Sequence, residues 1–261
     1  QISKAITKVS KSNKPTLISC KTIIGFGSPN KSGKASSHGS PLGDKEIALV
    51  RKKLKWNNKP FEISQEVLDE WRSIGNKGEL LEKKWKETLN KKNSKIKSDL
   101  EKNYLNSNLE NLENLIKKEK TKYFESKPSL ATRQCSMAAI ESISALLPQL
   151  IGGSADLSGS NNTKTNNSKI INFKNFDGNY IHYGVREHGM AAVMNGLALY
   201  GGLIPYGGTF LIFSDYCKPS IRLSALMGLK VIYIFSHDSI GLVEDGPTHQ
   251  PIEQLTGLRA I

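Results

Sequence analysis

The chain has 261 residues, 38% of them hydrophobic, so it is long enough to bury a core as one large domain or two smaller ones. Its three cysteines are too few and too scattered for a disulfide framework or a zinc site, which favours a reducing compartment and predicts a cytoplasmic protein. No run reaches the roughly 18 to 20 apolar residues of a membrane span, and the first residues lack the apolar core of a signal peptide.

The formal net charge of +13 is concentrated near the beginning, where residues 1–59 hold 13 Lys and Arg against 2 acidic residues. Such a basic segment can attract nucleic acid or a phosphorylated ligand. Its aromatic residues are sparse, however, and its lysines are scattered rather than arranged in a stripe with stacking side chains. We therefore expect a solvated lysine surface and no binding to nucleic acid or membrane.

Two segments precede the main part of the sequence. Residues 16–24 form an apolar, β-branched run between Pro15 and Gly25, which predicts a short buried strand. One strand cannot form a domain and the chain does not begin with Met, so we interpret residues 1–43 as the tail of a domain that begins upstream. Residues 44–127 are helical in pattern and rich in Lys and Asn around a thin leucine stripe, which predicts a connecting segment.

Residues 128–261 alternate between helix and strand patterns. Strands are expected at "QLIGGS", "NYIHYG", "LIPYGGTF" and "KVIYIFS", with helical patterns before and between them. Such alternation implies right-handed crossovers, and hence an α/β fold in which helices flank a parallel sheet. We expect this domain to be incomplete at its C-terminal end.

Unusual polar clusters follow each of these strands: "GGSADLSGSN", "GVREHGM", "GGTFLIFSDY" and "SHDSIGLVEDGPTHQP". Parallel sheets place their ligands at the carboxyl ends of the strands. We therefore expect the four clusters to meet on one rim of the sheet and to form a ligand site there.

Five motifs, "GVREHGM", "GGTF", "SHDSIGLVEDGPTHQPIE", "GGSADL" and "ATRQCS", together resemble transketolase, a thiamine diphosphate enzyme of the pentose phosphate pathway. "KTIIGFGS" and "SSHGSPLG" look like the end of that family's diphosphate-binding domain, and residues 128–261 look like most of its pyrimidine-binding domain. The resemblance implies transfer of a two-carbon ketol unit from a ketose phosphate to an aldose phosphate. It also implies a homodimer with its active site at the subunit interface.

The same resemblance implies that part of the site lies outside this sequence. The family binds Mg²⁺ or Ca²⁺ with the cofactor, and the metal ligands are expected upstream of residue 1. We therefore interpret the chain as an internal fragment and expect it to be inactive alone.

Glu187 stands out because charged groups seldom begin a run of small, buried-looking residues unless they are paired or used. The residues alone favour a Glu stabilised by a helix N-terminus and paired with Arg186. The resemblance instead implies catalysis: the carboxyl group hydrogen-bonds the cofactor's pyrimidine ring and favours the tautomer that can remove the thiazolium C2 proton.

Phe210, Phe213 and Tyr216 are spaced three residues apart, which puts them near one face if the segment is helical. Spacing alone favours core packing, although Gly207 and Gly208 just before them permit close approach of the backbone. The resemblance implies an aromatic slot for the aminopyrimidine ring, with Phe213 as the ring that stacks on it.

Four of the five histidines lie beside turn residues, where each is either a hydrogen-bonded loop residue or part of the site. The resemblance places His38 near the cofactor and the reacting carbonyl, and gives it a catalytic role together with His249. It implies a sugar channel lined by His237, Asp245 and His249. No role is carried onto His188, and His182 is expected to pack within a strand.

Arg133 and Ser160 match the family's contacts to the terminal phosphate of the sugar, and a guanidinium fork and a hydroxyl suit a dianion. From the residues alone they are equally a surface arginine and a turn serine. The resemblance also implies that Asp156 and Leu157 support the cofactor. Two alternatives remain open: a dihydroxyacetone synthase, which uses formaldehyde as acceptor, and a non-catalytic binding or dimerisation module of the same fold.

Overall fold

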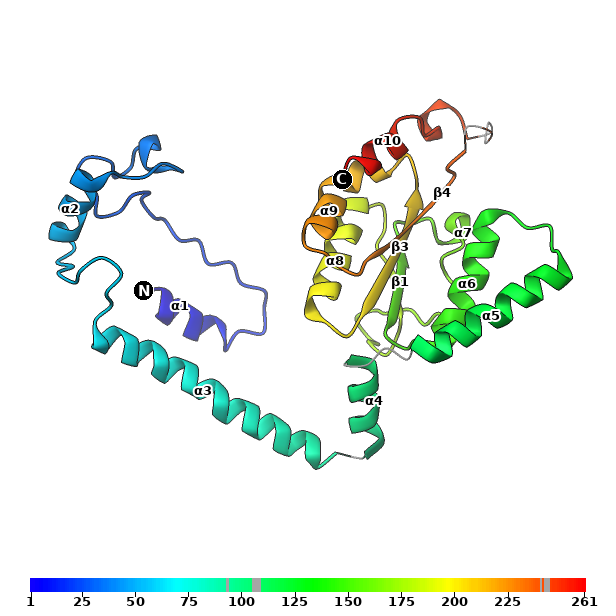
Figure 1. Ribbon diagram of the computed structural model, residues 1–261, viewed down its shortest axis with the longest axis horizontal. Coiled ribbons are helices and arrows are strands. Elements are labelled where there is room, and N and C mark those ends of the chain that lie inside the picture. Colours follow the sequence, from blue (N-terminus) through cyan, green and yellow to red (C-terminus); the bar gives the residue numbers. More distant parts are fainter. Residues whose placement is uncertain (93, 105–108, 240, 242–244) are drawn as a thin grey trace. The chain divides into compact units, whose positions relative to one another are not determined.

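The computed structural model describes residues 1–92, 94–104, 109–239, 241 and 245–261. The chain forms two compact units, Gln1–Trp85 and Lys86–Ile261, and each is described by itself (Figure 1). The predicted site loop "SHDSIGLVEDGPTHQP" includes residues 240 and 242–244, which lie outside the described residues.

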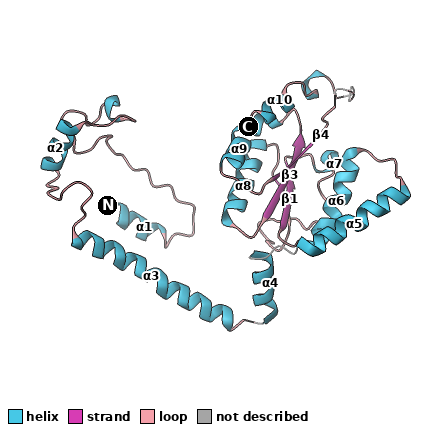
Figure 2. Ribbon diagram, in the orientation of Figure 1, coloured by secondary structure: helices cyan, strands magenta, loops and turns pink. Residues whose placement is uncertain are grey.

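The first unit is made of helices joined by long loops (Figure 2). Its helices are α1 (Ile2–Val9), the 3-10 helix η1 (Ala35–Ser37), α2 (Asp44–Lys53) and α3 (Gln65–Asn90), whose last residues belong to the second unit. The helical pattern predicted after residue 44 is confirmed.

The strand predicted at residues 16–24 is wrong. These residues form an exposed loop, in which Leu17 is 92% and Ile23 is 61% exposed. The four strands of the sheet all belong to the second unit. A β-branched run becomes a strand only when a neighbouring strand takes up its backbone hydrogen bonds, and propensity alone does not supply that neighbour.

One carboxylate holds a loop of the first unit against α2. Glu46 is buried and accepts hydrogen bonds from the Ser28 hydroxyl and, at 2.9 Å each, from the backbone and side-chain N–H groups of Asn30. Because these bonds favour the charged form, they lower the pKa of Glu46 from 4.5 to about 2, with Ser28 the largest cause. The contact therefore stabilises the unit above pH 4.5, and this contribution is lost as the pH falls toward 2.

The second unit begins with helices and continues as alternating strands and helices. The leading helices are α4 (Ser94–Tyr104), α5 (Leu109–Ser126) and α6 (Thr132–Leu146). The elements that follow are β1 (Leu150–Ser154), α7 (Ser158–Asn161), β2 (Tyr180–His182), α8 (Glu187–Tyr200), β3 (Ile204–Phe210), α9 (Ser214–Leu226), β4 (Ile232–Ser236), the 3-10 helix η2 (Pro247–His249) and α10 (Gln254–Arg259). The four predicted strands are confirmed.

The strands form one four-stranded sheet in the order β2-β1-β3-β4, and every neighbouring pair is parallel. The register pairs Leu150 with Ile204 and Tyr206 with Ile232. Since all four strands run in the same direction, their carboxyl ends lie at one edge of the sheet. The structure therefore confirms the predicted α/β fold with a parallel sheet flanked by helices.

Helices cover both faces of this sheet, with α8 and α9 on one side of β1 and β3 and α6 on the other (Figure 1). On the α6 side, Tyr206 packs in a buried cluster with Ile140 and Leu150. On the α8 side, Met190 and Met194 are fully buried against β3. The first residue of α8 is Glu187, so this packing fixes the start of the helix at the carboxyl edge of the sheet.

Two strand glycines permit this close packing. A Cβ atom at Gly152 would lie 2.0 Å from the Tyr206 ring, and one at Gly207 would lie 2.4 Å from the Met194 sulfur. Both distances are far below van der Waals contact, so a larger residue would displace its neighbour.

We expect Gly152→Ala to destabilise the protein by about 1 to 3 kcal/mol, because the added methyl must displace a well-packed ring. That ring is anchored by the Tyr206 hydroxyl, which donates to the Thr163 carbonyl at 3.0 Å. The matched control is Gly196→Ala in α8, where an added methyl meets nothing within 4 Å and should stabilise the helix by about 0.5 to 1 kcal/mol. Urea unfolding measures both changes, and equal stability of Gly152→Ala and the native protein would contradict the packing argument.

Candidate functional site

The carboxyl edge of the sheet brings the four polar clusters together, as the sequence predicts. The backbone N–H of Ala155, just after β1, donates to Gly208 O at 3.1 Å. The N–H of Tyr183, just after β2, donates to Ser154 O at 3.1 Å, and that of Leu211, just after β3, donates to Ser236 O at 2.9 Å. Each strand end is thus tied to its neighbour, which gives the rim a defined shape.

Glu187 is the first residue of α8 and is only 8% exposed. The pairing with Arg186 that the residues alone favour does not form, because Arg186 is exposed and its Nη1 donates to the Tyr183 carbonyl at 2.9 Å. Within the described part of the chain, no hydrogen bond or ion pair engages the Glu187 carboxyl group. A nearly buried carboxyl group without a protein partner is available to a ligand.

The start of α9 lies beside Glu187. Burial raises the pKa of the Cys217 thiol to about 12, and the charge of Glu187 adds to the increase. Cys217 is fully buried, and its sulfur points to the Ser214 carbonyl at 3.5 Å in the first turn of α9. That turn follows Phe213, so the carboxyl group and the aromatic residues belong to the same region of the rim.

The predicted aromatic residues form a row with two imidazoles. Phe210 stacks on His237 with ring centroids 3.8 Å apart, and on Phe213 at 5.6 Å and 12°. His249 lies edge-on to Phe210 at 5.8 Å and to Phe213 at 5.2 Å, while Tyr216 is tilted against Phe213 at 5.9 Å and is 65% exposed. The three aromatic rings lie next to one another, as their spacing predicts. Phe210 ends β3 and Phe213 is the N-cap of α9, so the row crosses a strand-to-helix turn.

The surroundings of His237 favour its neutral form. Burial lowers its pKa below 6.5, and the charges of Arg133 and His249 act in the same direction, against Asp245 and Asp238. Its Nε2 lies 3.7 Å from Asp245 Oδ2, which is too long for a hydrogen bond. Asp245 Oδ2 is buried and lacks a hydrogen-bond partner in the described part of the chain, so it can accept one from a ligand.

The remaining predicted residues of this unit lie on or near the rim. Arg133 is in the first turn of α6 and is exposed, yet its charge acts on His237. Ser160 is exposed in α7, directly after the β1 turn. In that turn Asp156 has a left-handed φ of 63°, and Leu157 donates its N–H to Ser154 Oγ at 3.1 Å.

His38 belongs to the first unit, where it follows η1 and is exposed. His182 does end β2, with its ring edge-on to Tyr180 at 5.3 Å, but it is exposed. His188 lies in α8, where its Nδ1 is 3.3 Å from Ser220 Oγ.

The sequence reasoning missed Asn161 and Ser236, buried polar residues at the rim, because small polar residues after a strand look like ordinary turns.

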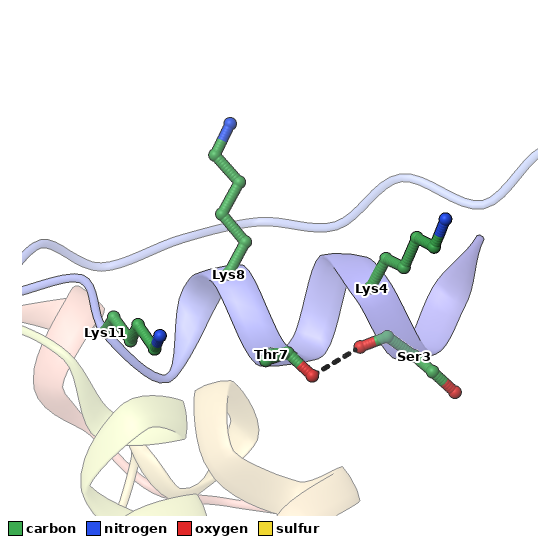
Figure 3. A pocket seen from close by; sticks show the side chains of 5 residues that line it. All are labelled: Ser3, Lys4, Thr7, Lys8 and Lys11. Carbon is green, nitrogen blue, oxygen red and sulfur yellow. Dashed lines mark hydrogen bonds between the residues drawn. The ribbon is translucent and has the colours of Figure 1, made fainter.

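A separate hollow runs along α1 in the first unit (Figure 3). It is lined by Ser3, Lys4, Thr7, Lys8 and Lys11, all from α1 and the turn after it, and its one internal hydrogen bond joins Thr7 Oγ1 to the Ser3 carbonyl at 3.0 Å. A single helix cannot enclose a ligand, so this hollow is not the site.

Over the described ranges, no helix is long and apolar enough to cross a membrane, and no cluster of three His, Cys, Asp or Glu is arranged to hold a metal ion.

Residues 128–261 match the family model "Transketolase, pyrimidine binding domain", and residues 1–110 match "Transketolase, thiamine diphosphate binding domain". A curated transketolase of Sinorhizobium medicae is 47% identical over 99% of this chain, which spans 37% of that protein. The crystal structure of a Campylobacter jejuni transketolase is similar with a TM-score of 0.85 and 39% identity, over 99% of this chain and 39% of that one. The structure of a Pichia stipitis transketolase in complex with sedoheptulose 7-phosphate is similar with a TM-score of 0.83 and 34% identity, and the match covers 99% of this chain and 39% of that one.

A parallel sheet whose carboxyl edge carries a nearly buried carboxyl group and a row of aromatic and imidazole rings defines an α/β cofactor-binding domain. The family matches make this assignment specific: the chain belongs to the transketolase family. The resemblance inferred from the five motifs is thereby confirmed. The chain spans well under half the length of the relatives it matches.

The charges around His237 predict how its titration responds to mutation. Arg133→Ala should raise the pKa of His237, because it removes a positive charge, and Asp245→Asn should lower it further. Arg222→Ala is the matched control, since the exposed Arg222 in α9 is not among the charges that act on His237. NMR titration of the imidazole measures these shifts, and opposite signs for the first two variants would contradict the described geometry.

Proposed function

We propose that this chain is part of a transketolase that uses thiamine diphosphate to transfer a two-carbon ketol unit from a ketose phosphate to an aldose phosphate. The observation that carries the proposal is Glu187, a carboxyl group 8% exposed that has no hydrogen-bond partner among the described residues and lies at the rim that carries the aromatic row. Family membership supports the reaction class. Sugar phosphates are supported by the solved relatives, which include complexes with sedoheptulose 7-phosphate and with fructose 6-phosphate.

The rim suits the aminopyrimidine ring of the cofactor. Phe213, which is partly exposed and backed by the buried Phe210, offers a face for a flat heterocycle, and Tyr216 extends the row outward. The unpartnered Glu187 carboxyl group can hydrogen-bond a ring nitrogen, and Asp156 and Leu157 shape the neighbouring β1 turn. Bound there, thiamine diphosphate would supply a carbon nucleophile and an electron sink.

Glu187 acts in this scheme through a proton on its carboxyl oxygen. From the first turn of α8 the carboxyl group can donate this proton to a ring nitrogen and take it back. Water is largely excluded at 8% exposure, which strengthens the hydrogen bond. Glu187 is therefore the acid-base group of cofactor activation.

The imidazoles and Asp245 bind and orient the sugar. Neutral His237 can donate to a hydroxyl or to a developing alkoxide, and His249 flanks the same aromatic pair. The buried Asp245 Oδ2, which lacks a partner in the described part of the chain, fits a hydroxyl donor. His38, on the first unit, is proposed to act on the reacting carbonyl.

Arg133 and Ser160 are proposed to hold the terminal phosphate of the sugar. Both are exposed, as a site for a solvated dianion requires, and the charge of Arg133 reaches the rim at His237. A guanidinium fork matches two phosphate oxygens at once.

Three further properties complete the proposal. Mg²⁺ or Ca²⁺ is proposed to accompany the diphosphate, held by residues that this sequence does not contain. A homodimer is proposed because α8 carries apolar side chains that are exposed in the single chain, namely Val193 at 45%, Leu199 at 57% and Tyr200 at 76%. The free thiols of Cys20, Cys135 and Cys217 support a cytoplasmic location.

In the intact protein, Glu187→Gln should lower the rate of ketol transfer by about 10² to 10⁴-fold, because an amide cannot exchange the required proton. Hydrogen–deuterium exchange at the thiazolium C2 position, followed by NMR, isolates the activation step. The control is Glu66→Gln, an exposed residue in the first turn of α3, which should leave both rates unchanged. Normal C2 exchange in Glu187→Gln would remove this residue from the mechanism.

Arg133→Ala should raise KM for phosphorylated sugars by roughly 10 to 100-fold, since a charged hydrogen bond contributes about 1.5 to 3 kcal/mol, and should change kcat little. Arg222→Ala removes an exposed arginine of α9 and should leave KM unchanged. Steady-state kinetics with a phosphorylated and an unphosphorylated acceptor provide the comparison. An equal loss on both acceptors would count against a phosphate contact.

A further inference from the structure

A chain of buried polar groups leads from β1 through α7 to His237. Ser154 Oγ donates to Asn161 Oδ1 at 3.1 Å, and Asn161 Nδ2 donates to Ser236 Oγ at 2.6 Å. Ser236 Oγ in turn lies 2.9 Å from His237 Nδ1. Ser154 and Asn161 are fully buried and Ser236 is 8% exposed, so protein groups must satisfy these polar atoms.

The Asn161 amide bridges Ser154 and Ser236. Ser154 Oγ accepts from the Leu157 N–H at 3.1 Å, and its single hydrogen has two acceptors within 3.1 Å, Asn161 Oδ1 and the Gly208 carbonyl. The structure places Asn161 Oδ1 toward Ser154 and the Nδ2 donor toward Ser236.

This orientation determines where the imidazole carries its proton. Ser236 Oγ accepts from Asn161 Nδ2, and its one hydroxyl hydrogen is then directed at His237 Nδ1. An Nδ1 that accepts a hydrogen bond bears no hydrogen, so neutral His237 carries its proton on Nε2.

We propose that Asn161 is a positioning residue that, through Ser236, fixes His237 as the Nε2–H tautomer and so presents a constant hydrogen-bond donor to the sugar. The inference rests on the proposed function for the part that concerns the sugar. The tautomer itself depends only on the hydrogen bonds described above.

Two further contacts hold the ring in this orientation. It stacks on Phe210 at 3.8 Å, which opposes rotation of the ring, and the backbone of His237 is held at a left-handed φ of 53°. Its Nε2 faces Asp245 Oδ2 at 3.7 Å, so the donor and the acceptor without a partner lie side by side on the rim. A sugar diol can accept from the first and donate to the second, whereas the Nδ1–H tautomer would present two acceptors.

Asn161→Asp tests the proposal with little change in shape. The new carboxylate can only accept, so Ser236 must donate to it and accept from His237 Nδ1 instead, which reverses the tautomer or leaves both nitrogens protonated. Asn162→Asp is the control, since it makes the same change one residue along, at the partly buried C-cap of α7 and outside this hydrogen-bond chain.

Neutron diffraction from deuterium-exchanged crystals of the intact protein gives the direct measurement. We expect deuterium on Nε2 and none on Nδ1 of His237 in the native protein and in Asn162→Asp, and deuterium on Nδ1 in Asn161→Asp. Deuterium on Nδ1 in the native protein, or an unchanged Nε2–H tautomer in Asn161→Asp, would overturn the proposal. If Asn161→Asp does not fold, Ser236→Ala removes only the hydroxyl, and deuterium should then no longer be confined to Nε2; an imidazole that stays exclusively Nε2–H would overturn the proposal equally.

Kinetics provide a readout that separates the two proposals. Asn161→Asp should lower kcat/KM for the ketose donor by roughly 10 to 100-fold while the C2 exchange that depends on Glu187 stays normal. If the intact protein shows the Nε2–H tautomer of His237 but catalyses no ketol transfer, the proposed function is refuted, whereas the positioning role of Asn161 stands. A reversed tautomer in Asn161→Asp with unchanged kcat/KM would refute the link to the sugar.

Discussion

The burial of the Glu187 carboxyl group depends on how α8 meets the sheet. Met190 and Met194, one and two turns along the helix, are fully buried against β3, and Gly207 leaves room for their sulfur atoms. This packing holds the first turn of α8 at the carboxyl edge, where Glu187 is 8% exposed and has no partner in the described part of the chain. The aromatic row, the imidazoles and the Asn161 chain all converge on the same edge, so the chemistry follows from where one helix begins.

The rim combines two kinds of polar group. Ser154, Asn161 and Ser236 are buried and satisfy one another, and they stabilise the turns after β1 and β4. Among the described residues, Asp245 keeps a buried carboxylate oxygen without a hydrogen-bond partner, and Glu187 is 8% exposed with no hydrogen bond to its carboxyl group. The groups that satisfy one another give the rim a single shape. The groups without partners can form hydrogen bonds with a ligand, and these bonds would contribute to its binding free energy.

Much of the second unit could be predicted because its strands are apolar runs bounded by turns, and alternation with helices leaves few topologies. The same reasoning failed at residues 16–24, because a local pattern does not reveal whether a partner strand lies beside it. The end of β3 at Phe210 and the helix that follows Phe213 were both predicted, whereas the spacing of three residues had suggested that the two rings share one helix face. Asn161 was missed because it acts through a hydrogen bond to Ser236, which lies 75 residues away in the sequence, and no local pattern reveals such a contact.

The central claim is that the Glu187 carboxyl group contacts the pyrimidine ring of thiamine diphosphate. A crystal structure of the intact protein with the cofactor bound measures this contact directly. The account predicts a Glu187 oxygen within about 2.6 to 3.2 Å of a ring nitrogen, with the ring against Phe213. A cofactor bound with its pyrimidine ring elsewhere, or a Glu187 side chain turned to solvent, would contradict it.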